Sequence, residues 1–458
     1  MTDLATLIIL AAGCAAWWAT CPCDVSSRRK AALAAIPPAG MLIVRAVGGA
    51  GLALDLASVG MVVLVGLLAG YWLVVRREWP KGAMVLALAA VTAAGTFWRQ
   101  EVMEQVRANP LQPDVRHFQQ QAQRTFNPYA AGLKSPLWSA MHAPLLRLAA
   151  NPDHAMRFWS WVFGVAMLPI VGLVIGRLFD PVVGVVVAGL LAADSYLANL
   201  CCEGLREEMG LCLWMAVLLL LFEGDSRSWK RVVLAGAAGG VLIWLRNVEL
   251  VPLAALPAWA AISRRWTLLQ AAVALLLSLL IVLPFYVNQY RTYGNALAME
   301  QREARGLVNL EFLGQSVPAD VAMPTAEQVA ADPFAGEPVS PAKYLFGMRS
   351  PRDLVSRQLR GLYHVLAGRS FEYGYSRWTA LACGAGLVAT VLSRRHRFVI
   401  VMVLFSLLGL RAHMVSLGHV DLRLLLPVMV MWLTAGTWFA ALLVRLGGRR
   451  WLTMKAEG

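Results

Sequence analysis

Ionisable side chains stand beside apolar runs of the sequence at four places, and their types suit one kind of chemistry. A carboxylate can take a proton from a hydroxyl or an amine, and Arg or Lys can hold a phosphate and stabilise the charge that develops on it. Such groups suit a site that activates an acceptor and holds an anionic leaving group, for instance the phosphate of a lipid-linked phosphosugar. The four places are Asp114, Arg206-Glu207-Glu208, Arg246…Glu249, and His419…Asp421…Arg423.

The histidines and cysteines give no pattern typical of a metal site. His117, His142 and His419 are scattered and lack metal-ligand spacing. Cys21-Pro-Cys23 is too closely spaced for a zinc ribbon and has no second pair downstream. We therefore expect reduced, structural thiols and no zinc site.

The composition indicates which elements must position these groups. Of 458 residues, 59% are hydrophobic and 15% are charged, and the mean hydropathy is +0.59. Soluble proteins have about 45–50% apolar and about 25% charged residues, so an ordinary cytosolic enzyme is excluded, as is disorder. The net charge of +14 is better explained by short basic cytoplasmic loops than by nucleic-acid binding. The sequence predicts an all-α polytopic membrane protein.

About thirteen apolar runs approach the length of about 20 residues that a membrane helix needs, and we expect 11–13 of them to span. The second run is the least regular, because Pro37-Pro38 and Arg45 interrupt it. The runs are Leu4–Thr20, Ala32–Asp55, Ser58–Val75, Met84–Trp98, Met156–Gly176, Val182–Leu200, Gly210–Phe222, Val232–Leu245, Val251–Ile262, Leu268–Tyr286, Trp378–Leu392, Phe398–Leu410 and Leu424–Val444.

Basic residues fall on alternate connections between these runs, which predicts that those connections are cytoplasmic. The acidic clusters and both long loops, Arg99–His154 and Asn288–Arg377, then lie on the external side. We expect four regions: extra N-terminal helices (1–80), a core with the first external loop 99–154 (81–290), a second external loop (291–377), and C-terminal helices with a cytoplasmic tail (378–458). The basic connections contain Arg28-Arg29-Lys30, Arg76-Arg77…Lys81, Arg177, Arg227…Lys230-Arg231, Arg264-Arg265, Arg394-Arg395…Arg397 and Arg449-Arg450.

The two long loops each contain a segment with the pattern of an amphipathic interfacial helix. These segments are Asp114–Arg124 and Pro351–Leu366, the latter with Leu354, Leu359 and Leu362 on one side. Between them, Val317–Pro341 is rich in Pro, Ala and Asp and predicts an external loop. No internal repeat is visible, whereas many transporters have paired halves.

Five motifs in order on the predicted external face resemble glycosyltransferases of the GT-C superfamily. The resemblance is to the group that contains dolichyl-phosphate-mannose-protein mannosyltransferases and lipid A aminoarabinose transferases, and it covers roughly Met84 to Val444. One departure is that Asp114 stands alone where the family often has two adjacent acids, with Phe118 in the aromatic place. The motifs are Pro113-Asp114-Val115…Phe118 with Asn127-Pro128-Tyr129 and Lys134-Ser135-Pro136-Leu137-Trp138, Gly204-Leu205-Arg206-Glu207-Glu208, Trp244-Leu245-Arg246-Asn247…Glu249, Asn288…Tyr293-Gly294-Asn295, and Asp421-Leu422-Arg423-Leu424-Leu425-Leu426-Pro427.

The resemblance implies an inverting hexosyl- or pentosyltransferase that moves a sugar from a polyprenyl-phosphate donor to a lipid, glycan or protein acceptor. By analogy, Asp114 is the general base, and Lys134 and Arg423 contact the donor phosphate. The resemblance also implies an integral protein of a bacterial inner membrane, with its active site on the external or periplasmic side. Residues expected to line the site are Arg206, Glu207, Glu208, Tyr129, His419 and Asp421.

Each assignment has a simpler structural alternative. Asp114 can cap a short helix, Lys134 can extend along the interface with its charge in water, and Arg423 can pair with Asp421. The acids of Arg206-Glu207-Glu208 can pair with the arginine, and Arg246…Glu249 fits an intramembrane ion pair.

Two further alternatives concern the cofactor and the function. A divalent cation can bridge Asp114 and Glu207 or Glu208 to the donor phosphate; no other cofactor is expected. The chain can also be a transporter or flippase of lipid-linked sugars, which would favour charges along a path through the membrane, or a non-catalytic lipid-binding subunit. Membrane lipids are expected partners and nucleic acid is not.

Overall fold

The computed structural model describes residues 81–223, 228–246, 249–314, 321–365, 377–407, 411 and 422–457. Every regular element among these residues is a helix, so the all-α polytopic fold predicted from the sequence is confirmed for this part of the chain. The first three apolar runs, the region 1–80, Asn247, His419 and Asp421 lie outside the described residues.

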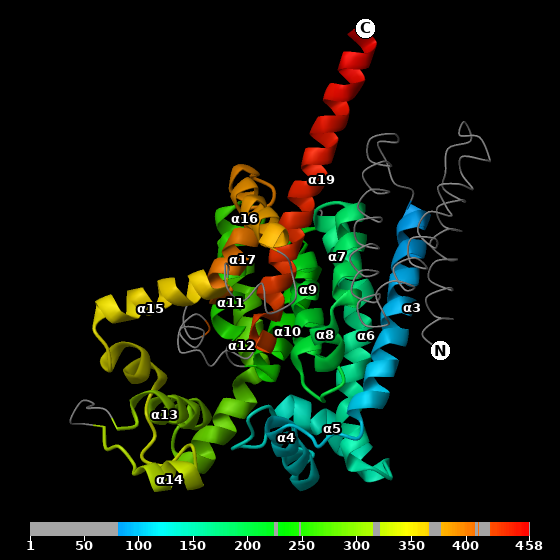
Figure 1. The fold of residues 1–458 in the computed structure, drawn as a ribbon. Coiled ribbons are helices and arrows are strands. Elements are labelled where there is room, and N and C mark those ends of the chain that lie inside the picture. The colour runs from blue at the N-terminus through cyan, green and yellow to red at the C-terminus, as the bar shows by residue number, and fades with distance from the viewer. Residues whose placement is uncertain are drawn as a thin grey trace.

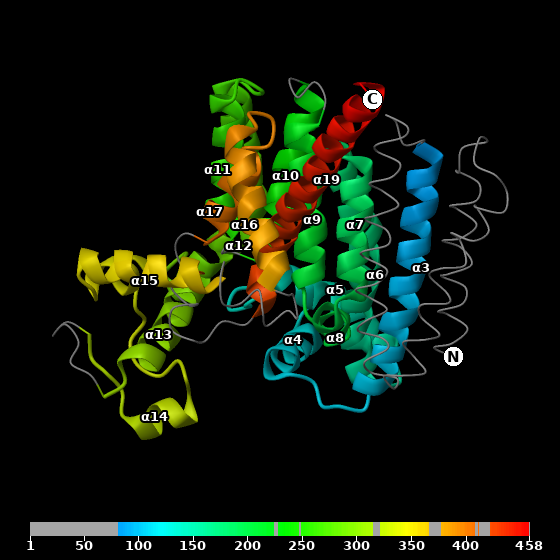
Figure 2. The same cartoon turned by 45° about the horizontal axis from the view of Figure 1, so that its top comes forward.

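Ten of the helices in the described part of the chain form a bundle, in which they run side by side (Figures 1 and 2). Each apolar run predicted from Met84 onward coincides with a bundle helix, because continuous apolar sequence favours helices that satisfy their own backbone hydrogen bonds in lipid. These helices are α3 (Lys81–Val106), α6 (Pro152–Leu178), α7 (Pro181–Ala193), α9 (Glu207–Phe222), α10 (Trp229–Leu245), α11 (Leu250–Ile262), α12 (Leu268–Tyr293), α16 (Arg377–Leu392), α17 (Phe398–Leu407) and α19 (Leu426–Glu457), which follows the short 3-10 helix η5 (Leu422–Leu425).

Three of the described helices are long and apolar enough to cross a membrane: Pro152–Leu178, Leu268–Tyr293 and the part of α19 over Leu426–Leu443. Shorter apolar helices accompany them over Pro181–Ala193, Pro252–Ile262, Leu381–Leu392 and Phe398–Leu407. These findings establish an apolar helical membrane protein. The number of 11–13 spans stays a prediction.

Two boundaries predicted from hydropathy were wrong. The run Val182–Leu200 is not one helix, because Asp194 ends α7 and caps α8 (Ser195–Leu200), its carboxylate accepting the N–H of Leu197 at 2.9 Å. The first loop is also shorter than Arg99–His154. Helix α3 continues to Val106, and the buried guanidinium of Arg99 donates to the carbonyl of Leu191 at 3.1 Å.

The two ends of the bundle carry different connections. The basic connections α6–α7, α9–α10, α11–α12 and α16–α17 meet at the end toward which α19 projects (Figures 1 and 2). There Phe398 stacks on Phe222 at 4.3 Å and packs near Phe179 at 5.8 Å, so connections far apart in sequence touch. The opposite end carries α4 (Pro113–Arg124), α5 (Pro136–Leu148) and α8. The basic connections among the described residues thus share one end, as predicted, while those in the region 1–80 lie outside the described residues.

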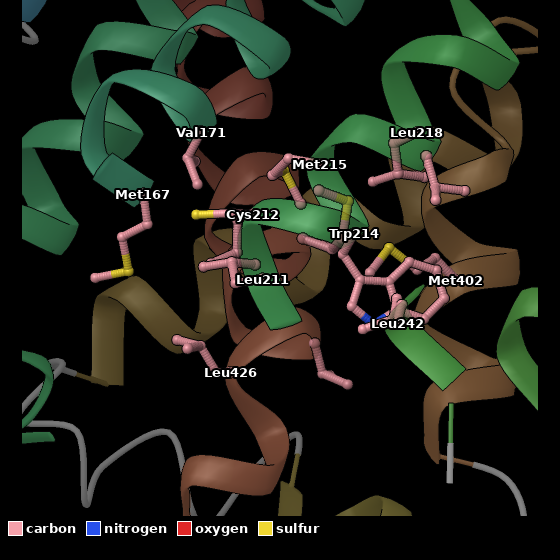
Figure 3. Close-up of a cluster of buried hydrophobic side chains, with 14 of the residues drawn as sticks. Met167, Val171, Leu211, Cys212, Trp214, Met215, Leu218, Leu242, Met402 and Leu426 are labelled. Carbon is pink, nitrogen blue, oxygen red and sulfur yellow. The ribbon is translucent and has the colours of Figure 1, made fainter. Parts of the chain in front are cut away.

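The core of the bundle is predominantly apolar around the middle of α9. Figure 3 shows Met167 and Val171 of α6 facing Leu211 and Cys212 of α9, with Trp214 on the far side of that helix. Trp214 is fully buried. Close approach of helices α6 and α7 depends on small residues, since a Cβ at Gly184 would lie 2.2 Å from the carbonyl oxygen of Gly172.

The second long loop folds into a small helical unit beside the end of α12. It contains α13 (Ala298–Phe312), α14 (Ala326–Ala331), the π-helical turn η2 (Lys343–Gly347) and α15 (Pro351–Tyr363). Val308, Val339 and Tyr344 form its buried centre. Glu311 of α13 pairs with Arg349 and, at 2.6 Å, with Arg357 of α15.

Both amphipathic helices predicted in the loops are present. The segment Asp114–Arg124 is α4, and Pro351–Leu366 contains α15, which ends at Tyr363. Helix α15 lies crosswise to the bundle helices (Figure 2). Its Val355, Leu359 and Tyr363 side chains are each more than half exposed. An unpartnered apolar stripe of this kind is typical of a helix at a membrane interface.

Candidate active site

Helix α4 holds Asp114 at the end of the bundle away from the basic loops. Pro113 occupies the first helical turn, where its missing N–H costs nothing. Val115 and Phe118 face inward and are buried, so the residues on the opposite side of α4 face away from the core. The N-cap residue is Gln112, and Asp114 lies inside the first turn. The alternative that Asp114 is the capping residue is therefore wrong.

Three residues expected at the site from the sequence lie together. The Asp114 carboxylate accepts a hydrogen bond from Nη2 of Arg423 at 2.5 Å through Oδ2, and its Oδ1 lies 3.4 Å from Nζ of Lys134. The Asp114 side chain is 35% exposed, Lys134 31% and Arg423 16%. A carboxylate and two cations thus meet where all three side chains are partly exposed.

The two cations set the charge of Asp114. Burial alone would raise the pKa of this carboxyl, but the charges of Lys134 and Arg423 and the hydrogen bond from Arg423 outweigh it and lower the pKa below its usual value. Asp114 is accordingly ionised at neutral pH. An ionised carboxylate is the form that can accept a proton.

His117 lies next to this group on α4. Its Nε2 is 2.7 Å from the amide nitrogen of Gln121, whose Oε1 accepts from Ser139 of α5 at 3.1 Å. Burial and the nearby charge of Lys134 lower the pKa of His117. The ring is therefore neutral near pH 7 and adds no charge to the site.

Arg206 approaches α4 from the start of α9. Its guanidinium carbon lies 5.0 Å from the centre of the Phe118 ring, one helical turn after Asp114. Its backbone N–H donates to Oε2 of Glu207 at 2.9 Å. The side chain of Glu207 pairs with Arg246 at 3.8 Å, so the expected alternative of an Arg206–Glu207 side-chain pair is not what the structure has.

A buried ionic chain continues from Glu207 into the bundle. Arg246 lies 3.8 Å from both Glu207 and Glu249, and Glu249 is paired with Arg411 and accepts from the indole of Trp214 at 3.0 Å. The predicted Arg246–Glu249 ion pair is thus present. Sequence reasoning missed Arg411 and Trp214. The only signal for Arg411 was a charge directly after an apolar run.

The remaining predicted residues have other surroundings. Glu208 turns toward α6, where Ser160 Oγ lies 3.5 Å from its Oε2. Tyr129 stacks on Trp244 of α10, with ring centres 4.3 Å apart, and its carbonyl accepts from Asn288 of α12 at 3.0 Å. Tyr129 therefore fastens the first loop to the bundle. His419 and Asp421 lie outside the described residues.

Within the described part of the chain, no three His, Cys, Asp or Glu side chains gather as a metal site would require. His142, one of the scattered histidines, lies buried between the carbonyls of Trp138 and Met156 at 2.9 and 3.0 Å. The carboxylates of Asp114 and Glu207 each face cations. The bridging divalent cation stays a hypothesis.

Comparison with known protein families gives a match over the central third of the chain. Residues 133–289 match the dolichyl-phosphate-mannose-protein mannosyltransferase family. The match confirms the resemblance over this stretch, which contains Lys134, Arg206-Glu207-Glu208 and Arg246. Neither the curated proteins nor the solved structures gave a match to the chain.

The mannosyltransferase family match has a direct consequence for the class of protein. Together with the apolar helices, it indicates an integral membrane glycosyltransferase of the GT-C type. Asp114, Tyr129 and Arg423 lie outside the matched stretch. They are linked to it by contacts, because Asp114 pairs with Lys134 and with Arg423, and Tyr129 stacks on Trp244.

Proposed function

We propose that this glycosyltransferase moves a sugar from a polyprenyl-phosphate-linked donor to a lipid, glycan or protein acceptor on the external or periplasmic face of a bacterial inner membrane. The observation that carries the proposal is the contact of Asp114 with both Lys134 and Arg423. Such a transfer needs a potential base and cations that can bind phosphate, close to one another.

In the proposed step, Asp114 takes the proton of an acceptor hydroxyl or amine as that atom attacks the anomeric carbon. The bond from this carbon to the phosphate oxygen breaks, and its electron pair leaves with the polyprenyl phosphate. Attack opposite the leaving group inverts the anomeric centre. Lys134 and Arg423 stabilise the negative charge that grows on the departing phosphate.

The carboxylate of Asp114 contacts both cations, at the position that a phosphate would take. We infer that the donor phosphate replaces it there. Once Lys134 and Arg423 turn to the phosphate, the interactions that lower the pKa of Asp114 weaken. Donor binding would therefore make Asp114 a stronger base at the moment when an acceptor can react.

The second loop supports this arrangement from the side. Glu300 of α13 accepts a hydrogen bond from the Tyr286 hydroxyl of α12 at 3.2 Å. The charge of Arg302, on the same turn of α13, acts on His117. These interactions bring α13 to the edge of the site. A helical cover of this kind would limit access of water to the donor.

The experiment is transfer by the full chain in nanodiscs supplied with radiolabelled polyprenyl-phosphate sugars and membrane extract. Wild type is compared with Asp114→Asn and with the matched change Asp332→Asn, which alters an exposed carboxylate in the second loop. Label should reach a lipid, glycan or protein with wild type and Asp332→Asn, and not with Asp114→Asn. Addition of EDTA tests the separate hypothesis of a divalent cation.

Two results would oppose the proposal. Full transfer by a folded Asp114→Asn protein would remove Asp114 as the base. Movement of intact donor across the bilayer without any transfer would favour the flippase interpretation.

A further inference from the structure

Arg206 has unused hydrogen-bonding capacity beside the candidate site. Its Nε and Nη1 atoms are buried, and neither has a hydrogen-bond partner within the described part of the chain. Buried donors without partners are rare and costly, more so when they carry charge. The side chain as a whole is partly exposed, whereas its Nε and Nη1 atoms are buried, so a ligand would reach these two atoms only if their neighbours moved slightly.

The neighbouring acids are not available to Arg206. Glu207 receives the Arg206 backbone N–H and turns its other oxygen to Arg246. Glu208 faces Ser160 on α6. Glu249 is paired with Arg246 and Arg411. Within the described part of the chain, the buried ionic chain therefore leaves Nε and Nη1 of Arg206 without a hydrogen-bond partner.

Arg206 lies against the helix that carries Asp114, the partner of Lys134 and Arg423. It lies over Phe118, which follows Asp114 by one turn on the same face of α4. The charge of Glu207 acts on it most strongly, and those of Glu303 on α13 and of Asp114 act on it more weakly, although no ion pair joins its side chain to any of the three among the described residues. Arg206 is thus placed between the first loop, the second loop and the start of α9.

We propose that Arg206 is a third phosphate-binding residue of this site and contacts the lipid phosphate together with Lys134 and Arg423. This inference rests on the proposed function for its ligand. An arginine presents a planar fork of donors that suits phosphate oxygens.

A third cation changes which phosphate the site holds best. The sugar donor is a phosphodiester with one negative charge, whereas the released polyprenyl phosphate is a monoester with a second pKa near about 6 and hence close to two charges at neutral pH. Coulomb attraction is proportional to the ligand charge. Arg206 therefore strengthens binding of the leaving group more than binding of the donor, which favours the charge distribution at bond cleavage.

The test measures equilibrium binding of polyprenyl monophosphate to the full chain in nanodiscs at pH 7.5, with its methyl phosphodiester and the uncharged polyprenol as companion ligands. Arg206→Gln should weaken monophosphate binding roughly 10- to 100-fold, the usual effect of one charged hydrogen bond. The diester should lose less and the polyprenol nothing. The control Arg116→Gln, an exposed arginine on α4, should bind all three as wild type does.

Equal monophosphate binding by wild type and Arg206→Gln would overturn the inference. Should that variant not fold, Arg206→Lys serves instead: it keeps the charge without the fork, so a several-fold loss supports the proposal and unchanged binding opposes it. The binding assay is separate from the transfer assay. If wild type transfers no sugar but Arg206→Gln still weakens monophosphate binding, only the proposed function is rejected. If wild type transfers sugar and Arg206→Gln binds monophosphate as wild type does, only the role of Arg206 is rejected.

Discussion

The Asp114 carboxylate lies 2.5 Å from Nη2 of Arg423, although 309 residues separate the two in the chain. One belongs to a short helix of the first long loop, and the other to the turn that opens the last helix. Lys134 joins the same carboxylate from the connection before α5. The candidate site thus depends on the packing of the whole bundle and on no single motif.

Replacement of the proposed base should reduce turnover and spare donor binding. We expect Asp114→Asn to lower kcat by about 10²–10⁴-fold, the usual contribution of a general base. Donor affinity should stay equal or rise, because the carboxylate no longer competes for Lys134 and Arg423. Single-turnover transfer and equilibrium donor binding measure the two effects. A loss of donor affinity with normal turnover would contradict this assignment.

The two cations should act on the phosphate. Lys134→Gln and Arg423→Gln should each lower kcat/KM by roughly 10- to 100-fold, as removal of one charged hydrogen bond does. Combining either with Asp114→Asn should give less than the sum of the separate effects, since the residues share one contact. A double-mutant cycle on kcat/KM provides the measurement. Strict additivity would argue against a common ligand.

The ion pairs of Asp114 should make stability depend on pH in one direction. Burial raises the pKa of this carboxyl, but Lys134 and Arg423 outweigh it, so the folded pKa lies below the unfolded value of about 3.9. The stabilisation is complete above the unfolded pKa and is lost as pH falls through the lowered folded value. The difference in Tm between wild type and Asp114→Asn should stay constant from about pH 8 to pH 5 and shrink below about pH 4. Thermal melts across this range measure the difference in Tm. A difference that grows below about pH 4 would contradict the prediction.

The buried ionic chain should matter more for stability than the ion pair at the other end. Glu249→Gln leaves Arg246 and Arg411 without their shared acid, and breaking such a buried pair costs about 3–5 kcal/mol. Glu223→Gln removes the partner of Arg177, whose side chain is 59% exposed, and should cost less than about 1 kcal/mol. Unfolding in mixed detergent micelles compares the two. Equal effects would mean that the buried charges are not individually important.

Helix α15 should contact the bilayer. An environment-sensitive dye on Leu359→Cys should emit at shorter wavelength in nanodiscs and be quenched by nitroxide lipids, because Leu359 is on the exposed apolar stripe. The same dye on Asp353→Cys, at the first turn of that helix, should report water. The signal of wild-type protein treated with the dye is subtracted from both. Identical emission at the two positions would exclude an interfacial helix.

Local sequence was enough to predict some of these features. The apolar runs from Met84 onward all became helices, and the alternation of buried and exposed residues placed Asp114 on α4. The Arg246–Glu249 pair was predicted because two opposite charges stand three residues apart between apolar runs. In each case the physical cause acts within a few residues, so the sequence contains it.

Other features depend on contacts between distant segments. Arg411 pairs with Glu249 across 162 residues, and nothing around Arg411 announces its partner. The break at Asp194 was missed because hydropathy ignores a single side chain that caps a helix. That Glu207 would pair with Arg246 was equally hidden, since the sequence suggested Arg206 as the partner of Glu207 and Glu249 as the partner of Arg246.

The origin of Arg423 in the turn before α19 has a consequence for biosynthesis. Ribosomes make Asp114 of the first loop 309 residues before they reach Arg423, and Lys134 follows Asp114 in the same loop. A nascent chain whose earlier helices are already inserted therefore still lacks one of the two cations that hold the carboxylate. The proposed catalytic residues come together only when the final helix enters the membrane. A prematurely terminated polypeptide would therefore insert into the bilayer without all three of them.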